Sequence, residues 1–161
     1  MRSVTHDRFG EPADVLQSTD TDRPAPQDGE LLVRVLLSPI HNHDLWTIRG
    51  NYGVRPDLPA TAGSEAVGIV EETGPGVDPA LKGRRVAVAG LKGSWAEYAV
   101  AQAAGAIPVP DEMPDAAAAQ LIAMPFSAIT LLEFLHVSRG DWVIQTAANG
   151  AVGKIMAVLA Q

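Results

Sequence analysis

The sequence contains no cysteine. Without a thiol, the chain cannot form a disulfide bond, use a thiolate nucleophile or bind zinc through sulfur. It also lacks an apolar run of membrane-spanning length, and its N-terminus lacks the hydrophobic stretch of a signal peptide. These absences predict a cytoplasmic protein that has no membrane partner.

Positive charge is also scarce, with 12 Lys and Arg residues against 19 Asp and Glu residues and a formal net charge of −7. A basic patch that could neutralise nucleic-acid phosphates is missing, so no nucleic-acid partner is expected. What is present is a globular composition, with 47% hydrophobic and 19% charged residues over 161 positions. A chain of this length can bury one sizeable core and the start of a second.

Short runs of β-type residues, separated by turns rich in glycine and proline, fill the first 110 residues. No long helical pattern lies between them, which is typical of a barrel. We expect an edge strand at residues 1–9, a polar loop at 17–29 and a hairpin-type connection between strands at 86–89 and 95–100. Further strands are expected at residues 30–37, 63–72 and 106–109.

The pattern changes at Pro110, where helical spacing replaces the short strands. Helices are expected at residues 113–123 and 125–136, before an apolar strand at 143–145, a glycine-rich turn and another helix. That order opens a βαβ unit, and a doubly wound sheet needs several such units. The predicted fold is a mainly β, barrel-like domain over residues 1–124, followed over 125–161 by the first strand–turn–helix unit of a truncated Rossmann-type α/β domain.

The segment Ala148–Gly153 has the G-x-G-x-x-G spacing of a dinucleotide-binding turn, with alanine at the first glycine position. Gly150 would let the backbone approach a pyrophosphate, and Gly153 would let helix and strand pack closely. The N-terminus of the helix would offer free N–H groups to an anion. The alternative is an ordinary tight strand–helix turn. The residue that selects NAD or NADP lies about 20 residues further along such a unit, beyond Gln161.

An irregular segment between the β-type runs Leu31–Leu37 and Ala66–Glu71 contains two histidines, a tryptophan and a tyrosine. Loops held on a strand scaffold are common sites of chemistry. Asp44 is expected to cap a short helical turn. Tyr52 lies in a predicted turn, Gly50–Gly53.

The histidines of this segment raise the question of a metal. Catalytic zinc needs three protein ligands and an open position, and His41, His43 and Glu65 could in principle supply them. Ser64 is a poor zinc ligand, and hydrogen-bonded loop residues are the other interpretation of the histidines. We expect no metal site.

A series of short motifs follows the first of these β-type runs: Asp44-Leu45, Gly50-Asn51-Tyr52, Leu58-Pro59 and Gly63-Ser64-Glu65. The series resembles the catalytic core of the medium-chain dehydrogenase/reductase superfamily, whose first domain is a GroES-like barrel. The later turn, IQTAANGAVG, is similar to that of the zinc-independent members, the quinone oxidoreductases and mitochondrial-type enoyl-thioester reductases. In the zinc alcohol dehydrogenases of this superfamily, a Cys and a His bind the metal where this sequence has His41 and Ser64.

The resemblance implies a nicotinamide cofactor, NADPH, with NADH as the alternative. Met124–Ala128 matches an N-P-x-T-A segment that lies beside the nicotinamide in the enoyl-thioester reductases. Ser127 keeps a hydroxyl there, whereas Met124 replaces the asparagine. The implied cofactor-binding residues are Ser127, Asn149, Gly150, Ala151, Val152 and Gly153.

Tyr52 lies in a segment that resembles Q-G-N-Y-G of the enoyl-thioester reductases, in which the matching tyrosine is the proton donor. Hydride addition to Cβ of an enoyl thioester leaves an enolate that must be protonated at Cα, and a phenol stays protonated at neutral pH. A positioned general acid contributes about 10²–10⁴-fold. The other interpretation is an aromatic residue that packs the turn. His41 and Trp46 are expected in the substrate pocket, which Trp46 would line or narrow.

The implied function is NAD(P)H-dependent reduction of an activated C=C bond without zinc, on an enoyl thioester or on a quinone or enone. The resemblance also implies a small-molecule substrate and a full-length homodimer. Two alternatives remain: a zinc-dependent alcohol dehydrogenase-like enzyme with altered ligands, and a non-catalytic GroES-like binding module. Fold alone does not decide between them.

Overall fold

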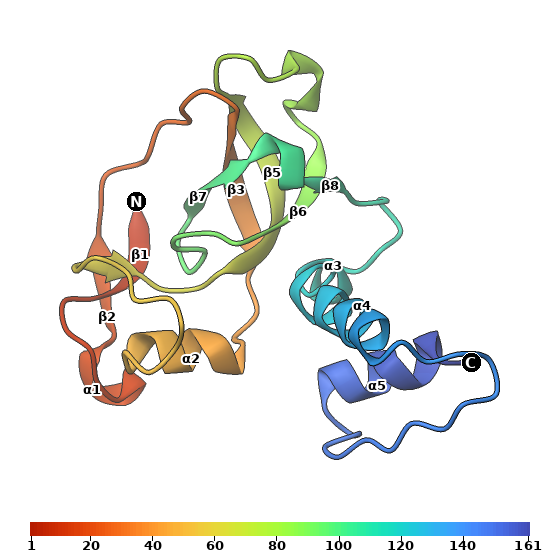
Figure 1. Cartoon of the computed structure of the whole chain (residues 1–161). Helices are drawn as coiled ribbons and strands as arrows, with labels where there is room; N and C mark the ends of the chain where they lie inside the picture. The colour runs from red at the N-terminus through yellow and green to blue at the C-terminus, as the bar shows by residue number, and fades with distance from the viewer. The chain divides into compact units, whose positions relative to one another are not determined.

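The computed structural model describes all residues, Met1–Gln161, as two compact units, Met1–Gln120 and Leu121–Gln161 (Figure 1). The first unit is built from β-strands with short helices, and the second is helical. Each unit is described by itself.

Two antiparallel sheets form the first unit. The larger has the order β7-β3-β5-β6-β8 and the smaller the order β2-β1-β4. A bridge between Ser3 and Ala96 joins β1 to the residues that precede β7. The predicted mainly β, barrel-like fold is thereby confirmed. The strands are β1 (Arg2–His6), β2 (Gln17–Asp20), β3 (Glu30–Leu37), β4 (Ala60–Thr61), β5 (Glu65–Thr73), β6 (Arg85–Ala89), β7 (Tyr98–Gln102) and β8 (Ile107–Pro108).

Short helices connect these strands. Figure 1 shows α1 (Pro12–Val15) and α2 (Asn42–Ile48) side by side at one end of the sheets, and the Gly10 N–H donates to the Ile48 carbonyl over 3.1 Å. The unit also contains α3 (Asp115–Ala118) and two 3₁₀ turns, η1 (Pro79–Leu81) and η2 (Ala103–Gly105).

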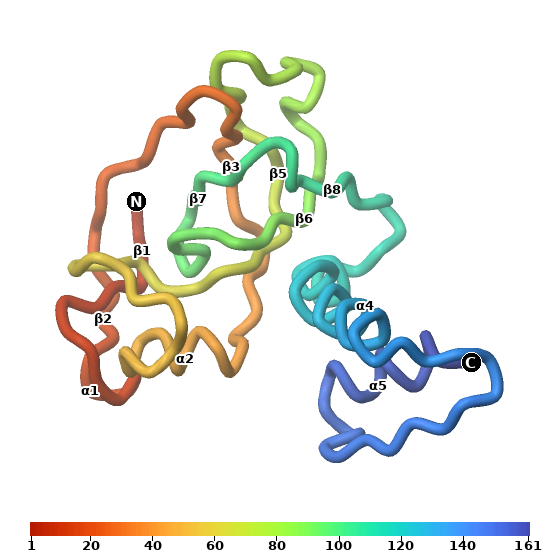
Figure 2. Tube along the Cα trace, in the orientation of Figure 1, coloured from red at the N-terminus to blue at the C-terminus, as the bar shows by residue number.

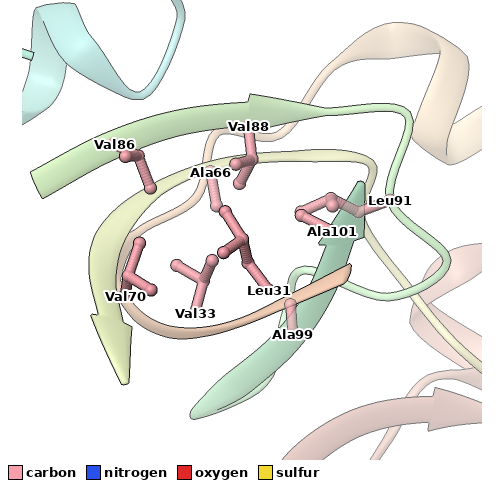
Figure 3. Packing of buried hydrophobic residues seen from close by; sticks show 9 residues of the cluster. All are labelled: Leu31, Val33, Ala66, Val70, Val86, Val88, Leu91, Ala99 and Ala101. Atoms are coloured by element: carbon pink, nitrogen blue, oxygen red, sulfur yellow. The ribbon is translucent and has the colours of Figure 1, made fainter. Parts of the chain in front are cut away.

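The core of the first unit lies on one face of the larger sheet (Figure 3). Strand side chains alternate between faces, so alternate residues of β3 and β6 contribute to it, together with Ala66 and Val70 of β5. Burial of each valine or leucine stabilises the fold by about 1.5–3 kcal/mol. The cluster comprises Leu31, Val33, Ala66, Val70, Val86, Val88, Leu91, Ala99 and Ala101.

A glycine permits the close pairing of β3 with β5. A Cβ on Gly68 would lie 2.4 Å from the carbonyl oxygen of Arg34 and 2.4 Å from a methyl group of Val33. The register of this strand pair shifts twice, between Leu32 and Val33 and between Val35 and Leu37. Glycine inside a strand commonly marks such a close backbone approach.

Three strand predictions were wrong. β1 is a central strand, because it pairs with both β2 and β4. Residues 17–20, predicted as loop, form β2 through backbone pairing that polar side chains do not prevent. The strands β6 and β7 do not form a hairpin: β6 pairs with β5 and β7 with β3. The loop between β6 and β7 instead lies beside the residues that precede β5, where the Leu91 N–H donates to the Ser64 carbonyl over 3.0 Å.

Two helix predictions also needed correction. Asp44 is not the N-cap residue of α2: His41 occupies that position, and Asp44 is the third helical residue, from which its carboxylate accepts the His41 N–H. The helix predicted at 113–123 is only the four residues of α3, with Pro114 at its N-cap.

The second unit consists of α4 (Ala123–Leu135) and α5 (Ala151–Leu159), which pack against each other. His136 ends α4 in the left-handed conformation, with φ 51°. Figure 2 traces the long connection that follows. Residues 141–145 pair with no strand, because a ladder needs a neighbour that this unit does not contain. None of the helices combines the length and apolarity that a membrane crossing requires.

Candidate functional site

The candidate site of the β unit begins where the chain leaves β3 and enters α2. The backbone N–H of His41 donates to Oδ2 of Asp44 over 2.9 Å. The carboxylate therefore satisfies a donor that the start of a helix leaves open, one half of a capping box. This bond fixes the direction in which the His41 and His43 side chains leave the helix.

The most buried polar contact of the site joins α2 to β5. Nε2 of His41 lies 2.5 Å from Oε2 of Glu65, and the two residues are 6% and 1% exposed. The backbone carbonyl of Glu65 accepts a hydrogen bond from the Ser38 hydroxyl over 2.6 Å. Buried polar groups need such partners, because an unmade hydrogen bond costs about 1–3 kcal/mol.

A second hydrogen-bonded chain runs beside the first. The Ser64 hydroxyl donates to Oδ1 of Asp44 over 2.7 Å, and Nε2 of His43 lies 2.8 Å from the same hydroxyl oxygen. Since the hydroxyl has a single hydrogen and gives it to the carboxylate, it must accept from His43. His43 therefore carries a hydrogen on Nε2.

Three rings stack above these hydrogen bonds. The ring of His43 lies 5.0 Å from that of His41 and 5.7 Å from that of Tyr52, with interplanar angles of 25° and 24°. Tyr52 is 47% exposed. The structure thus places an exposed phenol against the partly buried His43, which in turn stacks on the buried His41.

The loop that carries Tyr52 is anchored where α2 ends. Arg49 donates to both carboxylate oxygens of Glu11, at 3.0 and 3.1 Å from Nε. This hydrogen bond lowers the pKa of the Glu11 carboxyl and raises the pKa of Arg49. Because the pKa of Glu11 is lower in the folded state than in the unfolded state, its ionised carboxylate stabilises the fold at pH values above the unfolded-state pKa. This stabilisation is lost as the pH falls through the folded-state pKa. Arg49 also lies 5.8 Å from the ring of Trp46, which is 44% exposed.

The donor set fits a metal poorly. Nε2 of His41 points at Glu65, and Nε2 of His43 is bound to Ser64. No group of three His, Cys, Asp or Glu side chains has the arrangement of a metal site. Zinc needs three such ligands. In this site, His41 and His43 instead form hydrogen bonds with Glu65 and Ser64.

A separate candidate site, in the helical unit, is the turn before α5. Gly150 is the N-cap of α5, no side chain caps the helix, and its first helical bond runs from the Lys154 N–H to the Gly150 carbonyl. The N–H groups of the first helical turn, residues 151–153, are therefore open to an anion, whereas the Gly150 N–H donates to the Ala147 carbonyl. A Cβ on Gly153 would lie 2.5 Å from the Ala148 carbonyl oxygen, so the turn requires glycine there. This geometry fits a dinucleotide phosphate.

The predicted residues fall into the two units. The His43 ring stacks on both His41 and Tyr52 and so joins them in one cluster, and Trp46 lies on α2 with His43. The residues at 149–153 form the turn in the other unit. Ser127 lies on α4 and donates its hydroxyl to the Ala123 carbonyl over 2.8 Å.

Sequence reasoning missed the bridging role of Ser64. It was considered only as an unsuitable zinc ligand, whereas its hydroxyl connects His43 with Asp44. The sequence did carry a signal for a different contact: His41 and Asp44 are three residues apart, a spacing that is typical of a capping pair.

A GroES-like barrel that carries a polar site, followed by a dinucleotide-type turn, defines the class of the medium-chain dehydrogenases and reductases. Residues 27–111 match the family described as alcohol dehydrogenase GroES-like domain, and the chain belongs to that family.

Relatives and solved structures agree with this membership. The chain is 35% identical over 162 residues to the mitochondrial enoyl-[acyl-carrier-protein] reductase of Xenopus tropicalis, covering 99% of the chain and 46% of the relative. A mycobacterial protein complexed with NADPH is 34% identical, with a TM-score of 0.89, over 97% of this chain and 48% of that one. The quinone oxidoreductase of Thermus thermophilus is 27% identical, with a TM-score of 0.86, over 99% and 50%.

These likenesses confirm the predicted resemblance to the enoyl-thioester reductases and quinone oxidoreductases. The chain spans less than half the length of the curated relatives that it matches.

Proposed function

We propose that the protein to which this chain belongs uses NADPH to reduce the C=C bond of an enoyl thioester, without zinc. The observation that supports this most directly is the exposed phenol of Tyr52, stacked on His43. The imidazole of His43 is hydrogen-bonded to Ser64 and stacked on the buried His41. The likeness to enoyl-[acyl-carrier-protein] reductases supports the same substrate class.

The residues of the second unit would hold the cofactor, which supplies a hydride when it is bound. The open N–H groups at the start of α5 suit the negative charge of its phosphates. Gly150 and Gly153 keep side chains out of the turn, with Asn149, Ala151 and Val152 beside them. Ser127 would contribute its hydroxyl beside the nicotinamide, as the resemblance implies.

In this reaction, Tyr52 supplies the proton. Once Cβ carries the hydride, the substrate would be an enolate, and the phenol of Tyr52 would give its proton to Cα of that enolate. The phenolate then recovers a proton from water. His41 and Trp46 would border the substrate: His41 is held in place by Glu65, and Trp46 is half exposed.

Zinc independence is supported by the donor set, because His41 and His43 are hydrogen-bonded to protein groups. Metal analysis of the purified full-length protein tests it: about one zinc per chain that is lost in His41→Ala would favour an alcohol dehydrogenase-like enzyme. The cytoplasmic location and the homodimer remain predictions, and the curated relatives carry mitochondrial names.

A tyrosine substitution tests the function. In the full-length enzyme, Tyr52→Phe is expected to lower kcat on a short enoyl-CoA by about 100-fold, because the general acid is lost, and to leave NADPH affinity nearly unchanged. Tyr98→Phe is the matched control, since Tyr98 lies on β7, where Arg23 covers its ring. Steady-state kinetics and NADPH titration measure both effects.

Quinone reduction is the second candidate, favoured by the structural likeness to quinone oxidoreductases. The kcat of quinone reduction is expected to fall less in Tyr52→Phe than that of enoyl-CoA reduction, because a reduced quinone can take protons from water. A wild-type enzyme that reduces quinones but no enoyl thioester would make this the better assignment.

A further inference from the structure

Tyr52 has few contacts that could fix its ring. It lies between Gly50 and Gly53, and its phenol oxygen makes no hydrogen bond within the protein. Backbone bonds hold the start of the loop, including one of 3.0 Å from the Asn51 N–H to the Trp46 carbonyl. The ring contact of Tyr52 is with His43.

His43, by contrast, is fixed from two sides. Its Nε2–H donates to Ser64, whose hydroxyl is in turn bound to the buried carboxylate of Asp44. Its ring also stacks on that of His41, which is bound to Glu65. The plane of the His43 imidazole is therefore set by the buried Asp44 and His41 and by the partly buried Ser64 before β5.

We propose, on the basis of the function proposed above, that His43 is a positioning residue for the proton donor. The Asp44–Ser64–His43 chain fixes the imidazole plane, and this plane orients the phenol ring of Tyr52. Residues 40–44 resemble the segment I-N-P-S-D of the enoyl-thioester reductases, in which a serine stands in place of His43. A serine cannot stack on a phenol, so this orientation is a property of the present chain.

Orientation matters for rate because a reacting group that is displaced by about 1 Å can lose about 100-fold. It also matters for stereochemistry, since a fixed acid delivers its proton to one face of the enolate. When the acid is misplaced, water protonates the enolate and the preference for one face falls.

The test uses four forms of the full-length enzyme: wild type, His43→Ala, His43→Phe and His43→Ala with Tyr52→Phe. The reaction is reduction of a short enoyl-CoA by NADPH in deuterated water, with kcat, KM and the configuration of deuterium at Cα as readouts. His136→Asn is the control, because His136 is exposed at the end of α4 and asparagine accepts its left-handed backbone.

His43→Ala is expected to lower kcat by about 10- to 100-fold with little change in KM or NADPH affinity, and to mix the configuration at Cα. His43→Phe keeps a ring that can stack on His41 but cannot donate to Ser64, so it should recover only part of both. The double variant should be no slower than Tyr52→Phe alone, since His43 acts only through Tyr52.

Two results would overturn the proposal. One is a His43→Ala enzyme that retains the wild-type kcat and a single configuration at Cα while Tyr52→Phe is slow. The other is a double variant that is slower than Tyr52→Phe by the full effect of His43→Ala, which would give His43 a role of its own. A wild-type enzyme without enoyl-thioester activity would instead refute the proposed function.

Discussion

His41 and Glu65 show how strongly one residue pair can determine the local structure of this site. Their side chains meet at 2.5 Å, and both are buried. In the zinc enzymes that the sequence resembles, the position of His41 holds a metal-binding cysteine. In this chain, a hydrogen bond between side chains links α2 to β5 at that place.

Removal of one partner is therefore expected to be costly. Glu65→Ala leaves the buried His41 imidazole without its acceptor, and we expect a loss of about 3 kcal/mol in the free energy of unfolding. Urea titration followed by circular dichroism measures it. Glu71→Ala on the same strand is the control, because the ion pair of Glu71 with Arg34 is partly exposed and worth less than about 1 kcal/mol. Equal losses in the two variants would contradict a structural role for the buried pair.

The sequence predicted the chemical types in the site better than their connections. Tyr52 and His41 were identified from the resemblance, and the structure joins them through His43. The bridging of His43 to Asp44 by Ser64 was not predictable, because Ser64 is 20 or more residues away from both in the chain. Such a contact depends on how β5 enters the barrel beside α2, and periodicity within a segment carries no information about it.

At the scale of elements, strands with strong apolar patterns were predicted well. The expected strands at 30–37 and 63–72 correspond to Glu30–Leu37 and Glu65–Thr73. Pairing was predicted poorly: β2 is polar in sequence, and β7 pairs with β3 although β6 is nearer along the chain. The register and neighbours of a strand are set by long-range contacts, so a local pattern identifies a strand without placing it.

The turn before α5 offers a test at the same scale. Helix propensity alone predicts that Gly153→Ala stabilises α5 by about 1 kcal/mol. However, the added Cβ would lie 2.5 Å from the Ala148 carbonyl oxygen, a backbone atom that cannot rotate away. Overpacking of this kind costs about 1–3 kcal/mol, so the steric cost is expected to win.

Gly153→Ala should therefore lower the melting temperature of the full-length protein and weaken NADPH binding. Differential scanning calorimetry and NADPH titration measure the two effects. Gly105→Ala is the control, because a Cβ there meets no atom within 4 Å. A stabilised Gly153→Ala protein with normal NADPH affinity would show that the turn relaxes easily and that glycine is not required.

At the scale of the whole molecule, the chain contains two units with different degrees of burial. The β unit encloses a cluster of fully buried valines and leucines. The helical unit leaves large apolar side chains exposed, including Phe126 at 67% and Phe134 at 76%. The assignment of the first domain to 1–124 and the second to 125–161 remains a prediction.

The three tryptophans of the chain lie in three different environments, and this gives the protein its own optical reporters. Trp95 is packed beside Val15 and Ile48 and donates its indole N–H to the Pro39 carbonyl over 3.0 Å. Trp46 is half exposed, and Trp142 is 96% exposed. The red edge of the emission spectrum should therefore come mainly from Trp142, and Trp142→Phe should remove it while Trp95→Phe does not. Any chain segment or ligand that covers residues 141–145 would bury Trp142 and shift the emission maximum to shorter wavelength.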